Sequence, residues 1–158
     1  MGRHKGLKTL VLGLGNPILT DDSIGIRVAQ AIEQYYRGEA VTVMEASQAG
    51  LNLLDLIAGY DKLILIDAIQ TVGGDIGEVY RLETADLAST LHTSSPHGVN
   101  FATALELGKK LGVELPQEIV VFAIEVQDVT TFGEECTPEV GRAIAVAKDM
   151  VIQELKSA

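Results

Sequence analysis

Thr9-Leu10-Val11-Leu12-Gly13-Leu14-Gly15-Asn16-Pro17-Ile18-Leu19-Thr20-Asp21-Asp22-Ser23-Ile24-Gly25 is the stretch from which the fold of this 158-residue chain can be worked out. Its apolar first half is typical of a buried strand, and an amphipathic, helical pattern begins at Ile24. A strand, a short loop and a helix form the first unit of an α/β fold. Two adjacent acids, Asp21 and Asp22, occupy the loop, where such folds place their chemistry.

Further apolar or alternating runs, each bounded by Gly, Asp, Pro or Asn, predict five strands: Thr9–Leu14, Ala40–Glu45, Lys62–Ile66, Glu78–Leu82 and Glu118–Glu125. Helical periodicity lies between them, with apolar positions Ile24, Val28, Ala31, Ile32 and Tyr35; Leu51, Leu54 and Ile57; Phe101, Leu105 and Leu111; and Val140, Ile144, Ala147 and Val151. Thr137-Pro138 is a start signal for the last helix. The alternation predicts a three-layer α/β sandwich, a mostly parallel twisted sheet of about five strands with helices on both faces.

One strand of this sheet is expected to be antiparallel. Only the short, turn-rich segment 71–77 separates the run Glu78–Leu82 from the strand before it. A parallel crossover needs a longer connection, so the segment favours an antiparallel neighbour.

Size and composition predict a single domain covering residues 1–158. Hydrophobic residues make up 47% and charged residues 22%, and the longest apolar runs are strand-sized, so no membrane association is expected. The basic N-terminus precedes an apolar run that reaches Asn16 without a small-x-small cleavage site, which favours a first strand over a signal peptide. The lone Cys136 has no internal disulfide partner. A cytoplasmic protein is therefore predicted.

Several function classes are excluded by charge or by missing motifs. The net charge of −10 argues against nucleic acid as a partner. Gly13 and Gly15 suggest a dinucleotide-binding loop, but the third position of that fingerprint is Ile18, so the glycines are better interpreted as tight-turn residues. P-loop and Gly-x-Ser-x-Gly motifs are absent. Glu134-Glu135 before Cys136 should raise the thiol pKa and oppose a cysteine nucleophile.

Side chains with metal-binding chemistry follow the predicted strands. Asp21 and Asp22 follow the first, Asp67 follows Lys62–Ile66 directly, and a polar loop could bring His97 to the same edge. Two carboxylates and an imidazole from three loops would bind a borderline divalent metal or position a water. Each also has a plainer role: an aspartate can cap a turn or helix, and a loop histidine can bond locally. Two further strand-end acids could join the site or be solvated: Glu45 and Glu125.

The opening Val11–Pro17 is similar to that of peptidyl-tRNA hydrolases, whose motif continues to a Thr-Arg-His-Asn segment with the catalytic histidine. The comparable stretch here, Thr20–Ser23, has no histidine. That absence and the negative charge argue against this family.

The fuller resemblance is to the hydrogenase maturation endopeptidases, which trim the large subunit of nickel-iron hydrogenases. Their Gly-x-Gly-Asn, four residues, Asp-Asp/Glu and downstream glycine match Gly13 to Gly25. Their Gly-Leu-x-Leu-Leu segment resembles Gly50–Leu54, and their Asp-Ala after a hydrophobic strand resembles Asp67-Ala68. A histidine before the next long helix corresponds to His97, and a Ser/Thr-Pro-x-Val helix start to Thr137–Val140.

This resemblance implies that Asp22, Asp67 and His97 are the metal-recognising and catalytic residues, with Asp21 supporting them or capping a helix. The implied partner is a hydrogenase large-subunit precursor that loses its C-terminal extension after nickel insertion. Nickel would be recognised in the substrate, and no tightly bound resting metal is expected. Two alternatives are a metal-dependent peptidase or amidohydrolase with its own metal, and a nickel-site chaperone that does not cut.

Overall fold

The sheet is built around β1 (Thr9–Leu14) and β3 (Lys62–Ile69), which are buried along their whole length. The computed structural model describes residues 7–47, 53–83 and 98–157, with side chains from 105 onward in the last range. The strand order is β2-β1-β3-β5-β4, in which β2 (Val41–Ala46) and β4 (Val79–Glu83) form the edges and β5 (Glu118–Glu125) lies beside β3. All neighbouring strands are parallel except β4 and β5, which confirms the predicted mixed sheet.

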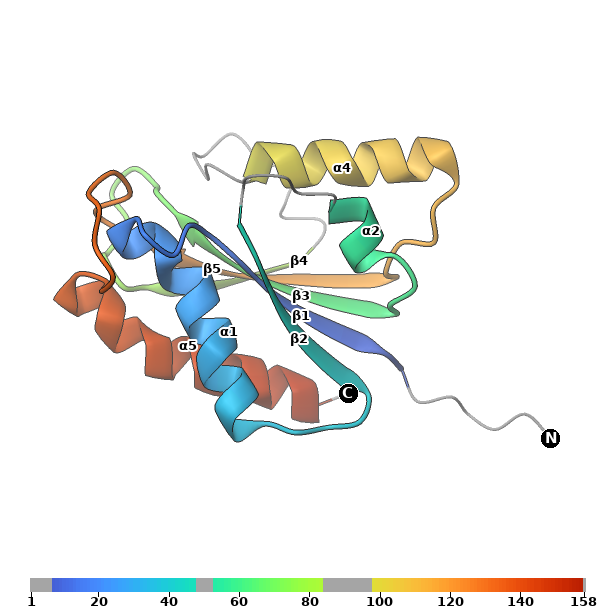
Figure 1. Ribbon diagram of the computed structural model, residues 1–158, viewed down its shortest axis with the longest axis horizontal. Coiled ribbons are helices and arrows are strands. Elements are labelled where there is room, and N and C mark those ends of the chain that lie inside the picture. Colours follow the sequence, from blue (N-terminus) through green and yellow to red (C-terminus); the bar gives the residue numbers. More distant parts are fainter. Residues whose placement is uncertain (1–6, 48–52, 84–97, 158) are drawn as a thin grey trace.

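Helices cover both faces of the sheet, as the sequence predicts (Figure 1). On one face lie α1 (Ile24–Tyr35), which follows the 3₁₀ turn η1 (Thr20–Ser23), and α5 (Pro138–Lys156). On the other lie α2 (Leu53–Ile57) and α4 (Gly98–Leu111). Alternate strand residues divide between the two cores, because successive side chains point to opposite faces. Among the described helices, none has the length and apolar character needed to cross a bilayer.

The antiparallel strand β4 has a different partner from the expected one. It pairs with β5, which lies between β4 and β3. Seven of the eight β5 residues are buried, whereas β4 alternates between half-buried and exposed positions. The continuously apolar strand β5 therefore lies in the interior of the sheet, and β4, whose exposure alternates, lies at the edge. The connection after β3 passes the end of β5, where the Gly77 N–H donates to the Glu125 carbonyl over 2.8 Å.

The helix faces agree with the predicted apolar positions except at two helix ends. Tyr35 is 72% exposed, because α1 ends there and the extended backbone at Tyr36 brings the next ring onto the core instead. Leu111, the last residue of α4, is 66% exposed. Leu51 lies outside the described residues, as does the side chain of Phe101.

A charged cluster ties the C-terminal turns of α5 to the amino-terminal edge of the sheet. The Glu154 carboxylate accepts from Arg81 Nε at 2.6 Å and lies 3.4 Å from the nearly buried Lys62 Nζ. Burial opposes ionisation of Glu154, but the Arg81 hydrogen bond and the two positive charges outweigh it. The pKa of Glu154 therefore lies below its ordinary value of 4.5.

Glu154→Gln is expected to make the free energy of unfolding depend less on pH in the acid range. A carboxyl with a lowered folded pKa stabilises the protein fully above its unfolded pKa, and this contribution is lost as pH falls through the folded value. The variant should be less stable than wild type at pH 7, by about 1–2 kcal/mol, and the gap should close as the pH falls below the ordinary carboxyl pKa of 4.5. Urea unfolding at several pH values measures this. Glu118→Gln is the matched control, because it removes the exposed partner of the same lysine; an equal effect there would contradict the assignment.

Candidate functional site

The glycines of the first loop bring α1 directly onto the sheet. A Cβ at Gly25 would overlap the carbonyl oxygens of Leu14 and Ile66, and one at Gly13 would overlap the Gly25 carbonyl. A Cβ at Gly15 would overlap the carbonyl of Asp22. The prediction of simple tight-turn residues was therefore incomplete. These glycines permit a close helix–sheet approach that holds η1 against the ends of β1 and β3.

Asp22 lies in η1 and is 4% exposed. Its backbone is held on both sides: its N–H donates to the Leu19 carbonyl at 2.8 Å, and its carbonyl accepts from the Asn16 N–H at 3.2 Å. Thr20, two residues earlier, has a φ of 21°, in a region that is costly for a β-branched residue. Its hydroxyl donates to the Thr131 carbonyl. The loop thus has a strained residue two positions before the buried Asp22.

Asp67 lies inside β3, two residues before its end, and not after it as predicted. The strand continues because β5 pairs with it as far as Ile69, whereas the pairing with β1 stops at Ile66. Asp67 is therefore the first β3 residue beyond the β1 ladder, and η1 packs against the same strand. It is 5% exposed, and its Oδ1 accepts the Ala68 N–H at 2.8 Å. The structure thus places Asp22 and Asp67 on adjoining elements at the carboxyl edge of the sheet.

The third predicted ligand, His97, lies outside the described residues, so its place in the site stays a prediction. The helix that follows it, α4, begins at Gly98. The far end of α4 lies near the amino-terminal edge, since the Gly59 N–H donates to the Glu114 carbonyl just before β3. The helix therefore starts toward the carboxyl edge (Figure 1). Within the ranges 7–47, 53–83 and 105–157, no three His, Cys, Asp or Glu side chains are grouped to hold a metal.

Asp21 has a different task from its neighbour. Its fully buried carboxylate accepts the backbone N–H groups of Gln127 at 3.1 Å, Asp128 at 2.9 Å and Thr137 at 2.7 Å. The Thr137 hydroxyl lies 2.9 Å from both of its oxygens. The N-caps of α1 and α5 are Ser23 and Thr137, so Asp21 is the N-cap of neither of these helices. It joins η1 to both ends of the segment between β5 and α5, a role without a sequence signal because its partners lie more than 100 residues away.

Comparison with known proteins identifies the family. The family model for hydrogenase maturation proteases matches residues 26–154. The chain belongs to the hydrogenase maturation protease family. It is 30% identical over 153 residues to the hydrogenase 2 maturation protease of Escherichia coli K12, covering 95% of this chain and 92% of that protein.

Solved structures of the family share the fold. The hydrogenase maturating endopeptidase HybD from E. coli superposes with a TM-score of 0.85 at 29% identity, covering 96% of this chain and 93% of that one. The nickel-iron hydrogenase maturation protease HybD from Thermococcus kodakarensis, at 22% identity, has a TM-score of 0.72 over 93% of this chain and 98% of its own. This family member is accordingly a peptide hydrolase.

The other acids at strand ends do not behave alike in this protease. Glu45 is exposed at the end of β2, as a solvated acid would be. Glu125 is 1% exposed and accepts from the backbone N–H of Thr71 at 2.8 Å, the Thr71 hydroxyl and the Tyr80 hydroxyl. Burial and the nearby Glu125 raise the pKa of Tyr80 to about 12, although the Thr71 hydrogen bond lowers it. Glu125 thus braces the loop after β3 and is not the solvated acid that was the alternative.

Cys136 in this protease is a half-buried structural thiol. Its Sγ lies 3.6 Å from the Thr20 carbonyl and from Ser23 Oγ. Burial raises its pKa, and the Asp21 carboxylate adds to the effect, while Ser23 and Arg27 oppose it. The predicted direction is confirmed, but the cause is burial and Asp21, not Glu134-Glu135. The thiol is thus unsuited to act as a nucleophile.

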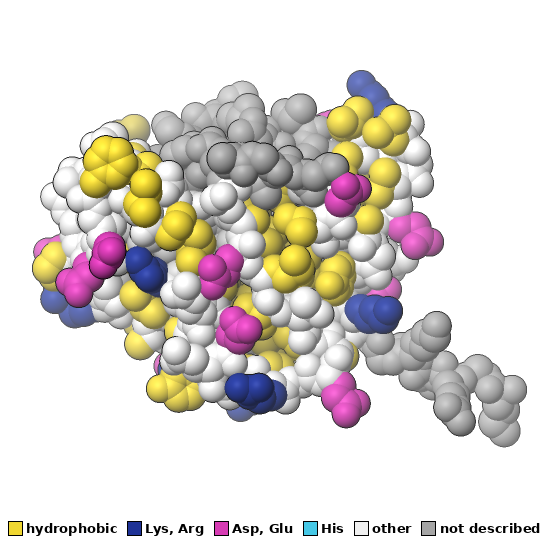
Figure 2. Space-filling model, in the orientation of Figure 1, with side chains coloured by type: hydrophobic (Ala, Val, Ile, Leu, Met, Phe, Trp, Pro, Cys, Tyr) yellow, Lys and Arg dark blue, Asp and Glu magenta, His cyan; other side chains and the backbone are white. Residues whose placement is uncertain are grey.

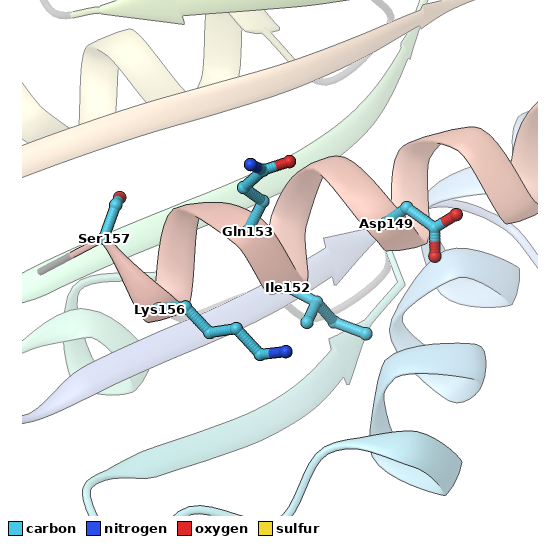
Figure 3. A pocket seen from close by; sticks show the side chains of 5 residues that line it. All are labelled: Asp149, Ile152, Gln153, Lys156 and Ser157. Atoms are coloured by element: carbon cyan, nitrogen blue, oxygen red, sulfur yellow. The ribbon is translucent and has the colours of Figure 1, made fainter.

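Two hollows of the protease differ in their distance from the acidic pair. One, of about 500 Å³, lies along the last turns of α5 between Asp149 and Ser157 (Figure 3). Those turns approach the amino-terminal edge, where Glu154 contacts Lys62, so this hollow is remote from Asp22. The other, of about 760 Å³, is lined by residues of the first loop, α1, the segment before α5 and the start of α5. It adjoins the segment that presents Asp22.

Proposed function

We propose that this chain is the endopeptidase that removes the C-terminal extension of a nickel-iron hydrogenase large-subunit precursor after nickel insertion. The observation that carries the proposal is the placement of Asp22 and Asp67, both nearly buried, on adjoining elements at one sheet edge in a member of this family. His97 is the proposed third member of the set. The single cysteine fits a reducing compartment, so we place the reaction in the cytoplasm.

The chemistry of the three side chains suits a metal that arrives with the substrate. Oxygen and imidazole ligands bind divalent nickel, and three of them leave coordination positions for the precursor's own ligands. Without thiolates or a closed tetrahedral shell, the set would not hold a metal tightly in the resting enzyme. Asp22, Asp67 and His97 would thus distinguish a loaded precursor from an empty one and orient it. One of the carboxylates would accept the proton of the water that attacks the scissile amide.

The test is to incubate purified enzyme with nickel-loaded and nickel-free precursor and to follow the precursor by mass spectrometry. The expected result is a shortened product from the loaded precursor only, with enzyme that carries less than stoichiometric metal by elemental analysis. Equal cutting of the nickel-free precursor by enzyme with one tightly bound metal would instead favour a metallopeptidase. Binding without a shortened product would favour a chaperone. Either result would overturn the proposal.

A further inference from the structure

The segment between β5 and α5, residues 126–137, is fastened to the loop that presents Asp22. The Gly133 N–H donates to the Ile18 carbonyl at 2.9 Å, and Leu19 and Phe132 form an isolated antiparallel bridge. The Thr20–Thr131 hydrogen bond and the Asp21 carboxylate add further connections. A surface held by this many bonds is preorganised, so little ordering would be needed when a partner binds.

This fastened surface exposes large apolar side chains. Phe132 is 77% exposed and Ile18 is 52% exposed, although the backbone of both is bonded. Hydrophobic side chains are visible over this end of the molecule, where Figure 1 places the loop between β5 and α5 (Figure 2). Beside them lies the hollow of about 760 Å³, whose lining is Pro17, Ile18, Arg27, Glu134, Glu135, Cys136, Gly141 and Ile144. Rigid, exposed aromatic and aliphatic residues beside a hollow are typical of a protein docking site.

The charge around the hollow specifies the chemistry of the partner. The one basic residue of its lining, Arg27, donates to the backbone carbonyls of Pro17 and Glu134. Its positive charge is therefore directed at backbone groups rather than at the neighbouring carboxylates. Glu134 and Glu135 are exposed, and neither forms an ion pair with a lysine or arginine in the described part of the chain. The rim of the hollow at Glu134 and Glu135 is therefore negative and complementary to a positively charged surface of a partner.

We propose that the hollow and the exposed Ile18 and Phe132 beside it form a docking groove for the hydrogenase precursor. The precursor would bind there with a part of its surface on which an apolar side chain lies next to a lysine or arginine. The apolar group would cover Ile18 and Phe132, and the cation would face Glu134 and Glu135. A second copy of this chain, which carries a net charge of −10, is poorly suited to the same rim. The proposal rests on the proposed function for the identity of the partner. It assigns recognition to side chains other than the carboxylates of Asp22 and Asp67.

The test compares two double variants over a range of loaded-precursor concentrations. Ile18→Ser with Phe132→Ser removes the apolar contact, and Glu134→Gln with Glu135→Gln removes the charge. We expect each to raise KM by about tenfold while kcat stays within about twofold of wild type. At about 0.5 M salt, the KM of wild type should rise nearly to that of the charge variant, because salt screens the Glu134 and Glu135 charges. The KM of the apolar variant should still be higher than that of wild type. Controls are Leu111→Ser and Glu33→Gln with Glu39→Gln, at exposed positions elsewhere.

The outcomes separate this proposal from the proposed function. If wild type cuts the precursor and both double variants keep the wild-type KM, the docking groove is wrong and the protease function stands. If wild type leaves the loaded precursor uncut, the proposed function fails. In that case a pull-down of the loaded precursor by wild type but not by the double variants would still support the groove, and equal capture would overturn it. Concentration-dependent dimerisation abolished by the apolar variant would also overturn it.

Discussion

Asp67→Asn is expected to lower the rate of precursor processing by about 10²- to 10⁴-fold while leaving the fold unchanged. The amide keeps an oxygen that can accept the Ala68 N–H, which Asp67 now accepts at 2.8 Å, so the local backbone should not move. What is lost is the negative charge that a divalent metal or an attacking water requires. Asp22→Asn and His97→Gln should have losses of similar size. Time courses with nickel-loaded precursor, followed by mass spectrometry, measure these rates.

Glu45→Gln is the matched control for this series. Glu45 pairs in register with Gly13 at the same end of the sheet, but it is exposed. Its loss should leave processing within about twofold of wild type, because a solvated acid has neither the burial nor the neighbours of Asp67. Far-ultraviolet circular dichroism and thermal unfolding should be unchanged in all four variants. Wild-type rates in the Asp22, Asp67 and His97 variants would contradict the assignment of the site.

Asp21→Asn is expected to lower the free energy of unfolding by about 3 kcal/mol and Tm by about 9 °C. Both carboxylate oxygens accept backbone N–H groups, one from Thr137 and the other from Gln127 and Asp128. Whichever way the new amide turns, its NH₂ group faces donors and cannot replace an acceptor. Processing should fall as well, because the 126–137 segment would lose its attachment to the loop of Asp22. Urea unfolding and differential scanning calorimetry measure the loss.

Two further variants test whether the loss of stability in Asp21→Asn comes from the hydrogen bonds that the Asp21 carboxylate accepts. Thr137→Val removes the hydroxyl but keeps the N–H, so it should cost only about 1 kcal/mol. Asp22→Asn changes the adjacent acid and should leave Tm nearly unchanged. Combining Asp21→Asn with Thr137→Val should cost less than the sum of the two, since they share an interaction. A wild-type Tm for Asp21→Asn, or full additivity, would contradict the role assigned to Asp21.

The elements of the fold were predictable because they depend on local pattern. β1 and β5 have the predicted bounds, and α1 and α5 follow the predicted periodicity except at Tyr35. In α4, Leu105 is buried as predicted and Leu111 is exposed. At Tyr35 and Leu111 periodicity continues in the sequence after the helix has run past the core it covers. The partner of β4 was not predictable from loop length, because β5, which separates it from β3, comes later in the chain.

The sequence by itself determined the α/β class, since strand and helix patterns are properties of neighbouring residues. It also predicted the sheet edge and the residues Asp22, Asp67 and His97 for the proposed site, from strand ends and motif spacing. Only the tertiary structure decided how the two adjacent acids divide their work. Asp22 lies in η1, which packs against β3, whereas the carboxylate of Asp21 accepts hydrogen bonds from Gln127, Asp128 and Thr137. The extension of β3 past Asp67 was likewise decided by pairing with β5. Hydrogen bonds between segments far apart in the chain leave no periodic trace in a sequence, so these roles become visible only once the chain has folded.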